Sequence, residues 1–290
     1  MKQRVVTAIF FGIAMIGGIY FSRDTFFWLF VVITAGCAWE LTGLLIPADE
    51  NRRRIRQLFG CLMALVPVLL IGQLSLFEAF CGLSTPEEIM NGHVGNQIRA
   101  FATAMILMSL LLSIAMLVEL FLSGRSPFAY LGYYALSPIY IGVPIAFLYS
   151  IATFDAFYQP NRVFGILWLV WTNDSFAYFI GSKIGRRKLL ERISPKKTWE
   201  GTIGGALLTL LMAWGISLFV RDFSPVQWLA LGGVVAVFGT LGDLIESMLK
   251  RSVAVKDSGG LFPGHGGFLD RFDAFLFVLP FSWLALMLLK

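Results

Sequence analysis

Charged side chains are scarce in this sequence of 290 residues. Asp, Glu, Lys and Arg make up 14% of it, hydrophobic residues make up 57%, and the mean hydropathy is +0.76. Soluble domains carry about 25% charged residues, so this chain has too little polar surface to cover a soluble particle of its size. The composition therefore predicts an integral membrane protein that forms one helical bundle with short loops.

Cysteine is also rare, and its positions argue against a cysteine-bound metal site and against a disulfide-rich fold. Cys37, Cys61 and Cys81 have neither metal-site spacing nor a paired framework, so we predict no disulfide. Cys37 and Cys61 lie inside apolar runs and are expected to be small packing residues. No repeat, low-complexity tract or soluble appendage is visible. The apolar run after residues 1–4 has no small-residue cleavage site behind it, which favours a retained signal-anchor helix.

Long apolar runs, by contrast, fill the sequence. A helix needs roughly 20 apolar residues to cross the hydrocarbon core of a membrane. The predicted fold class is therefore all-α, a polytopic membrane helical bundle of about nine transmembrane helices. The predicted spans are 5–21, 25–46, 58–77, 98–122, 132–152, 162–181, 201–220, 225–246 and 270–289.

The placement of Lys and Arg predicts the orientation of these spans. If the N-terminus is cytoplasmic, inner segments hold 18 of the 23 Lys and Arg residues and outer segments hold five. The positive-inside rule then favours an N-in, C-out topology. The same placement explains the net charge of +5 without nucleic acid, because the basic residues lie in short loops between apolar runs.

We divide the chain into two regions on this basis. Residues 1–155 are predicted to be a scaffold of the first five spans. Residues 156–290 are predicted to be the catalytic region, with the last four spans and two long cytoplasmic loops at about 182–200 and 247–269.

Carboxylates lie where a membrane protein rarely places them. Ionisable side chains inside spans are costly and mark functional sites. Asp174 lies in the inner half of the sixth span. Asp243 and Glu246, three residues apart and so on one helical face, end the eighth span. Asp270 and Asp273 open the ninth span with the same spacing.

A cation is needed between like charges that gather in this way. Oxygen ligands at this density suit Mg²⁺, so Asp243, Glu246, Asp270 and Asp273 are the predicted metal ligands. The alternative for Asp270 and Asp273 is that they only cap the ninth helix, favoured by its dipole. Two other carboxylates near inner span ends, Glu40 and Glu119, have no partners in sequence and are predicted to be structural.

The loop at 247–269 offers the complementary charge. It combines the cations Lys250, Arg251 and Lys256 with a series of glycines, and such a loop suits phosphate binding because glycine lets backbone amides approach an anion. His265 is a candidate acid, base or phosphate donor. A purely structural role for His265 stays open.

The loop at 182–200 repeats this pattern. Its run Ser-Pro-Lys-Lys-Thr-Trp-Glu-Gly leads into the seventh span, and a helix N-terminus preceded by lysines and hydroxyls is an anion site. The alternative is that the cations only set topology or contact anionic lipid. That alternative is preferred for Arg186, Arg187 and Lys188, and substrate contact is preferred for the Ser-Pro-Lys-Lys-Thr-Trp-Glu-Gly run. A carboxylate set beside two cationic loops indicates phosphoryl or nucleotidyl transfer, without identifying the nucleotide or the acceptor.

Residues 247–273 resemble the signature of the phosphatidate cytidylyltransferases, also called CDP-diacylglycerol synthases. Thirteen specified positions of that signature are met within 27 residues. They are Ser247, Lys250, Arg251, Lys256, Asp257, Gly259, Pro263, His265, Gly266, Gly267, Asp270, Arg271 and Asp273. The Ser-Pro-Lys-Lys-Thr-x-Glu-Gly run and the pair Gly242-Asp243 are also similar to features of this family.

This resemblance implies a reaction. CTP and phosphatidate would give CDP-diacylglycerol and pyrophosphate in phospholipid biosynthesis, at the cytoplasmic face of a bacterial inner membrane. It also implies a requirement for Mg²⁺, held by Asp243 and Asp270 with Asp273, K⁺ as a second cation, and a homodimer.

The residue roles follow from the two loops, the carboxylates and the resemblance together. The predicted catalytic residues are Asp243, Asp270, Asp273, Lys250 and His265. The predicted substrate-binding residues are Asp174, Ser194, Lys196, Lys197, Thr198, Glu200, Lys250, Arg251, Lys256, Asp257, Gly266, Gly267 and Arg271.

Two alternatives to this function remain. One is a CTP-dependent enzyme that acts on another lipid, either an ether-lipid cytidylyltransferase or a polyprenol kinase. The other is an ion-coupled transporter that uses its carboxylates as a relay. Transporters of that kind place acidic residues at the midplane and often have paired repeats, and the sequence shows neither.

Overall fold

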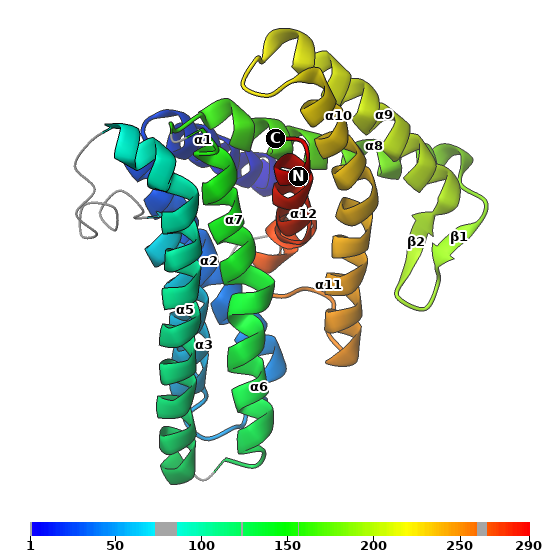
Figure 1. Ribbon diagram of the computed structural model, residues 1–290. Helices are drawn as coiled ribbons and strands as arrows, with labels where there is room; N and C mark the ends of the chain where they lie inside the picture. Colours follow the sequence, from blue (N-terminus) through cyan, green and yellow to red (C-terminus); the bar gives the residue numbers. More distant parts are fainter. Residues whose placement is uncertain (1, 73–85, 123, 156, 260–265) are drawn as a thin grey trace. The chain divides into compact units, whose positions relative to one another are not determined.

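The computed structural model describes residues 2–72, 86–122, 124–155, 157–259 and 266–290, and the side chains among them apart from 2–9 and 86–100. Nearly all of this described chain is helical (Figure 1). The helices are α1 Lys2–Tyr20, α2 Arg23–Leu45, α3 Arg53–Gly72, α5 Pro86–Leu122, α6 Pro127–Ser137, α7 Val143–Ala152, α8 Pro160–Ile184, α9 Trp199–Phe219, α10 Pro225–Val234, α11 Thr240–Ser252 and α12 Leu269–Leu288. Two π-helical segments, η1 Pro138–Gly142 and η2 Val235–Gly239, join α6 to α7 and α10 to α11.

The predicted helical membrane fold is confirmed. Eight helices of the described chain are long and apolar enough to cross a membrane, and they correspond to the second to ninth predicted spans. The first predicted span coincides with α1. The part of α1 whose side chains are described, Phe10–Tyr20, is apolar but shorter than the other spans. The protein is thus a multi-pass membrane protein, and its N-in, C-out orientation stays a prediction.

The structure differs from the prediction in the loop at 182–200. Part of this loop is a short antiparallel hairpin of β1 Lys188–Leu190 and β2 Ser194–Thr198, in which Lys188 pairs with Thr198 and Leu190 with Ser194. The sequence did not indicate strands here because both are short and β2 contains Pro195, which removes a donor from the ladder. The fold is therefore all-α apart from this hairpin.

The chain forms two compact units. The first unit comprises Met1–Tyr158 and Ser258–Leu269, and the second comprises Gln159–Asp257 and Asp270–Lys290. In the first unit α3 packs against α2, α5, α6 and α7, and Figure 1 shows α3, α5 and α6 running side by side. In the second unit α9 packs against α8 and α10. The functional division into a scaffold and a catalytic region stays a prediction.

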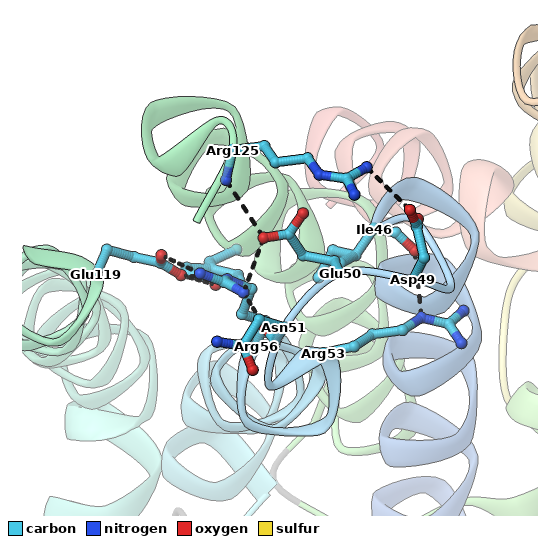
Figure 2. A network of polar contacts seen from close by, with 9 residues as sticks. Ile46, Asp49, Glu50, Asn51, Arg53, Arg56, Glu119 and Arg125 are labelled. Carbon is cyan, nitrogen blue, oxygen red and sulfur yellow. Dashed lines mark hydrogen bonds and ion pairs between the residues drawn. The ribbon is translucent and has the colours of Figure 1, made fainter. Parts of the chain in front are cut away.

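A buried polar network joins α3, α5, α6 and the loops beside them in the first unit (Figure 2). The Arg56 guanidinium on α3 is fully buried and donates to both carboxylate oxygens of Glu119 on α5, at 2.8 and 2.7 Å. The Tyr134 hydroxyl donates to Glu119 at 2.6 Å. Glu50, before α3, accepts from Arg56 and from the backbone of Arg125, each at 3.3 Å. α3 begins at Arg53, five residues before the predicted span, and Arg56 in its first turn is a buried partner and not an exposed loop cation.

We expect Glu119→Gln to destabilise the first unit. The substitution keeps the shape of the side chain but removes one of the two carboxylate charges that balance a buried guanidinium, which costs about 3 kcal/mol. The thermal midpoint of the purified protein in detergent measures this loss. The matched control is Arg125→Gln, because the Arg125–Asp49 ion pair is exposed and is worth about 1 kcal/mol at most. Equal midpoints for the two variants would contradict a stabilising role for the network.

Candidate active site

A pocket of about 620 Å³ lies in the second unit, between α8, the hairpin, the start of α9 and the start of α11. Its lining is rich in hydroxyls and charged groups, which is unusual next to membrane-spanning helices. The lining residues are Asp174, Ala177, Tyr178, Gly181, Ser182, Gly185, Lys188, Ser194, Lys196, Lys197, Thr198, Thr202, Thr240 and Asp243.

Close packing of α9 on α8 forms one wall of this pocket. A Cβ atom on Gly201 would lie 2.5 Å from the Ala177 carbonyl oxygen, and one on Gly205 would lie 2.9 Å from that of Asn173. Small residues allow helix backbones to approach this closely in membranes. Thr198 caps α9 by accepting from the Gly201 amide at 3.2 Å. The β2 strand therefore ends at the pocket, beside the N-terminus of α9.

The second wall is the start of α11, which follows the π-helical segment η2. Such segments inside helices are frequent at functional sites. A Cβ atom on Gly242 would lie 2.7 Å from Phe277 Cβ and 3.0 Å from Ala274 Cα, so glycine is required for α12 to pack here. The Asp243 carboxylate is consequently within electrostatic reach of both Asp273 and Asp174. These three carboxylates come from three helices, α8, α11 and α12.

Lys197 provides the cation beside Asp243. Its ammonium lies 2.6 Å from Asp243 Oδ2 and donates to the Thr240 carbonyl at 3.4 Å. Ser247 donates to Asp243 Oδ1 at 3.3 Å. The Lys197 and Asp243 side chains are 23% and 33% exposed, so this pair is accessible from the pocket. A carboxylate and an ammonium at one wall suit a ligand that carries phosphates.

Lys250 forms the second charge cluster of this unit. Its ammonium lies 2.7 Å from Asp270 Oδ1 and also forms an ion pair with Glu246, one turn earlier on α11. The Glu246 side chain is fully buried, and that of Asp270 is 11% exposed. One partly buried cation thus balances two of the predicted metal ligands. The structure brings Lys250, Glu246 and Asp270 together. The Lys250 ammonium, predicted to bind phosphate, here forms ion pairs with these two carboxylates.

These carboxylates fit Mg²⁺ only together with a substrate. Among the described residues, no three Asp, Glu, His or Cys side chains are close enough to hold one ion. Mg²⁺ is typically bound by one or two carboxylates and completes its octahedron with waters and substrate phosphates. Asp174 and Asp243 offer hard oxygen atoms on the pocket wall. The donor chemistry therefore suits an ion that arrives with a nucleotide.

The other predicted residues of the hairpin loop fall into two groups. Ser194, Lys196 and Thr198 line the pocket with Lys197. Glu200 instead accepts from the backbone amides of Arg186 and Arg187, at 3.0 and 3.2 Å. Glu200 therefore ties the end of α8 to the start of α9, and this contact supports the hairpin.

The described residues among those predicted in the loop at 247–269 do not gather at the pocket as those of the hairpin do. Arg251 is exposed and donates to the Val255 carbonyl at 3.2 Å. Lys256, Asp257 and Arg271 are also exposed. Gly266 has φ 84°, a left-handed conformation that favours glycine, and Gly267 is buried. His265 and Pro263 lie outside the described residues.

Eight residues of the pocket lining were not among the predicted site residues, and several of them carry polar groups that a substrate could contact. Thr240, Tyr178, Thr202 and Lys188 line the same cavity, although Lys188 had been assigned to topology. Helical spacing was the available signal, because Thr240 lies one turn before Asp243 and Tyr178 one turn after Asp174. Lys188 had no such signal, since its position depends on the strand pairing with Thr198.

The fold and the pocket define a class: a multi-pass membrane protein with a charged pocket suited to phosphate-bearing ligands. Comparison with known proteins is more specific. The model of the cytidylyltransferase family matches residues 2–289. The phosphatidate cytidylyltransferase of Bacillus subtilis (strain 168) is 36% identical over 291 residues, covering 99% of this chain and 98% of that protein.

Two further relatives carry the same name. The phosphatidate cytidylyltransferase of Staphylococcus haemolyticus is 35% identical over 248 residues, which is 76% of this chain and 92% of that protein. The one from Staphylococcus aureus (strain COL) is 43% identical over 147 residues, which is 50% of this chain and 55% of that protein. The chain belongs to the cytidylyltransferase family and is a membrane-embedded nucleotidyltransferase.

Proposed function

We propose that this protein transfers a cytidylyl group from CTP to phosphatidate, producing CDP-diacylglycerol and pyrophosphate for phospholipid biosynthesis. The observation that carries the proposal is the Lys197–Asp243 pair on the wall of the pocket in the second unit. Relatives named for this reaction, which align over nearly the full chain, support it.

The pocket offers several contacts for the triphosphate of CTP. Lys188, Lys196 and Lys197 supply positive charge, and the N-terminus of α9, capped by Thr198, supplies backbone amides and the positive end of the helix dipole. The hydroxyls of Ser194 and Thr202 add neutral donors. Together these groups hold the nucleotide and leave its α-phosphorus to the acceptor.

The transfer itself exchanges one phosphorus–oxygen bond for another. A phosphate oxygen of phosphatidate attacks the α-phosphorus of CTP and forms the new bond, while the bond from that phosphorus to the bridging oxygen of the β-phosphate breaks. Pyrophosphate leaves with the bonding electrons. No protein nucleophile is required, because the phosphatidate oxygen is already anionic at neutral pH. The lysines of the pocket stabilise the charge that develops on the leaving group.

We propose that Mg²⁺ accompanies CTP, with Asp243 and Asp270 as its chief ligands and Asp273 and Glu246 in support. When bound, this ion supplies charge neutralisation between the carboxylates and the phosphates. K⁺ as a second cation is a further part of the proposal. In this structure Lys197 pairs with Asp243 and Lys250 pairs with Asp270. Binding of the ion would therefore require both ammoniums to turn away from these carboxylates and towards the phosphates.

The proposed location is the cytoplasmic face of a bacterial inner membrane. The excess of Lys and Arg in the predicted inner segments supports this side. A site at the interface lets a soluble nucleotide meet the headgroup of phosphatidate in the inner leaflet. A homodimer is part of the same proposal.

A comparison of acceptors tests the proposed substrate. Purified protein is incubated with labelled CTP and Mg²⁺, and with phosphatidate, an ether-lipid analogue or a polyprenol as acceptor. We expect labelled CDP-diacylglycerol and one pyrophosphate for each product molecule, with phosphatidate as the preferred acceptor. Turnover with the ether lipid or the polyprenol, and none with phosphatidate, would contradict the proposal.

We expect Lys197→Ala to raise the KM for CTP about tenfold, since hydrogen bonds to charged groups contribute about 1.5–3 kcal/mol. Steady-state rates at varied CTP measure this change. The control is Arg192→Ala, which removes an exposed cation of the same hairpin that does not line the pocket. An unchanged KM in Lys197→Ala would leave this lysine only a topological role.

A further inference from the structure

Glu40 lies on α2, yet its carboxylate contacts the segment Ser258–Leu269, more than 200 residues later in the chain and within the same unit. The Ser258 hydroxyl donates to Glu40 Oε2 at 2.8 Å. The backbone amide of Leu269 donates to the same oxygen at 3.0 Å. One carboxylate oxygen therefore binds both ends of this glycine-rich segment.

The packing around Glu40 is as close as its hydrogen bonds. A Cβ atom on Gly259 would lie 2.4 Å from Glu40 Oε1, and one on Gly267 would lie 2.1 Å from Glu40 Oε2. One turn earlier on α2, a Cβ atom on Gly36 would lie 2.5 Å from the Phe268 ring. Gly36 and Glu40 thus lie on one face of α2, and this face contacts both ends of the segment. Larger residues at Gly259 or Gly267 would push the segment away from Glu40.

The contact with Leu269 has a direct consequence for α12. Leu269 is the first residue of that helix, and amides in the first turn of a helix have no partner within the helix. A carboxylate at this end satisfies such an amide and is stabilised by the helix dipole. Asp270, the proposed metal ligand, is the next residue along the chain. Glu40 therefore holds the chain at the first residue of α12, immediately before Asp270 in the sequence.

We propose that Glu40 is a positioning residue for the transfer reaction. It fixes both ends of the segment Ser258–Leu269 through hydrogen bonds and does not contact the substrates. This inference rests on the proposed function for the reaction that the segment serves, whereas the hydrogen bonds to Ser258 and Leu269 do not depend on it.

The test compares Glu40→Ala with Glu40→Gln. Alanine removes the acceptor, whereas glutamine retains an oxygen that accepts from both donors. We expect Glu40→Ala to lower kcat at least about tenfold with little change in the KM for CTP, and Glu40→Gln to restore kcat to within about threefold of the wild type. The control is Asp24→Asn, which changes an exposed carboxylate at the other end of α2. Wild-type kcat in Glu40→Ala, or an equal loss in both variants at Glu40, would overturn the inference.

A second readout needs no substrate. Hydrogen–deuterium exchange in the peptide that covers 266–270 should be about tenfold faster in Glu40→Ala than in the wild type or in Glu40→Gln, because the Leu269 amide loses its acceptor. Unchanged exchange in Glu40→Ala would overturn the inference, whatever lipid the enzyme uses. If the protein proved inactive with phosphatidate, this measurement would still decide the role of Glu40.

Ser258→Ala keeps the inference testable if Glu40→Ala does not fold. It removes one of the two hydrogen bonds, so kcat should fall about threefold below that of the wild type. Combining Ser258→Ala with Glu40→Gln isolates the shared contact, because residues in contact give non-additive effects. Additive losses in that double variant would contradict a joint role for Glu40 and Ser258.

Discussion

Asp243→Asn should abolish turnover, lowering kcat by roughly a thousandfold while the protein still inserts and folds. Asparagine has nearly the same shape but no charge, so it no longer pairs with Lys197 and no longer favours a cation beside the phosphates. Charge stabilisation by a bound ion is worth several kcal/mol in such reactions, and about 4 kcal/mol corresponds to the expected loss. The cost to folding should be small, because the Asp243 side chain is 33% exposed.

Rates with CTP and phosphatidate over a series of Mg²⁺ concentrations measure this effect, with size-exclusion elution as the check on folding. Glu191→Gln is the matched control, since Glu191 is an exposed carboxylate of the hairpin that does not line the pocket. Its rate should equal that of the wild type. Near-normal activity of Asp243→Asn at low Mg²⁺ would refute the metal assignment.

Lys250→Met should have the second-largest effect. The substitution removes the ammonium between Glu246 and Asp270 and leaves a fully buried carboxylate without a counter-charge. An uncompensated buried charge costs about 3–5 kcal/mol. We therefore expect a large drop in the thermal midpoint together with a loss of activity of more than about a hundredfold.

A compensating substitution separates the two effects of Lys250→Met. Glu246→Gln added to Lys250→Met removes the buried charge, so the thermal midpoint should recover. Activity should stay low, because the Lys250 ammonium, which we propose turns towards the phosphates when the ion binds, is still missing. Recovery of both the midpoint and the activity would show that Lys250 only balances charge, and the phosphate-binding role would then be wrong.

The sequence predicted the membrane helices well because hydropathy is a local property. Each predicted span has a helix at its position, and the departures arise from contacts that are distant in the chain. Arg56 was read as a loop cation because its partner Glu119 is 63 residues away in the chain. The hairpin was missed because its strands are defined by their pairing with each other and not by an apolar pattern.

The candidate site was predictable to a similar degree. The spacing of Asp243 and Glu246 and the unusual run from Ser194 to Glu200 are visible along the chain. The pairs that define the geometry are not visible in this way, because Lys197 on β2 meets Asp243 on α11, 46 residues further along the chain. Glu40 illustrates this limit most clearly. It has no acidic neighbours in sequence, and its partners Ser258 and Leu269 come from the far end of the chain.

Protection of a single cysteine by CTP tests the central claim, that the pocket of the second unit binds the nucleotide. In a background without Cys37, Cys61 and Cys81, Ser194→Cys and Leu190→Cys place thiols on paired positions of the hairpin, of which only residue 194 lines the pocket. We predict that CTP with Mg²⁺ slows maleimide labelling at 194 at least about tenfold and leaves labelling at 190 unchanged. Unprotected labelling at 194, or equal protection at both positions, would contradict the account.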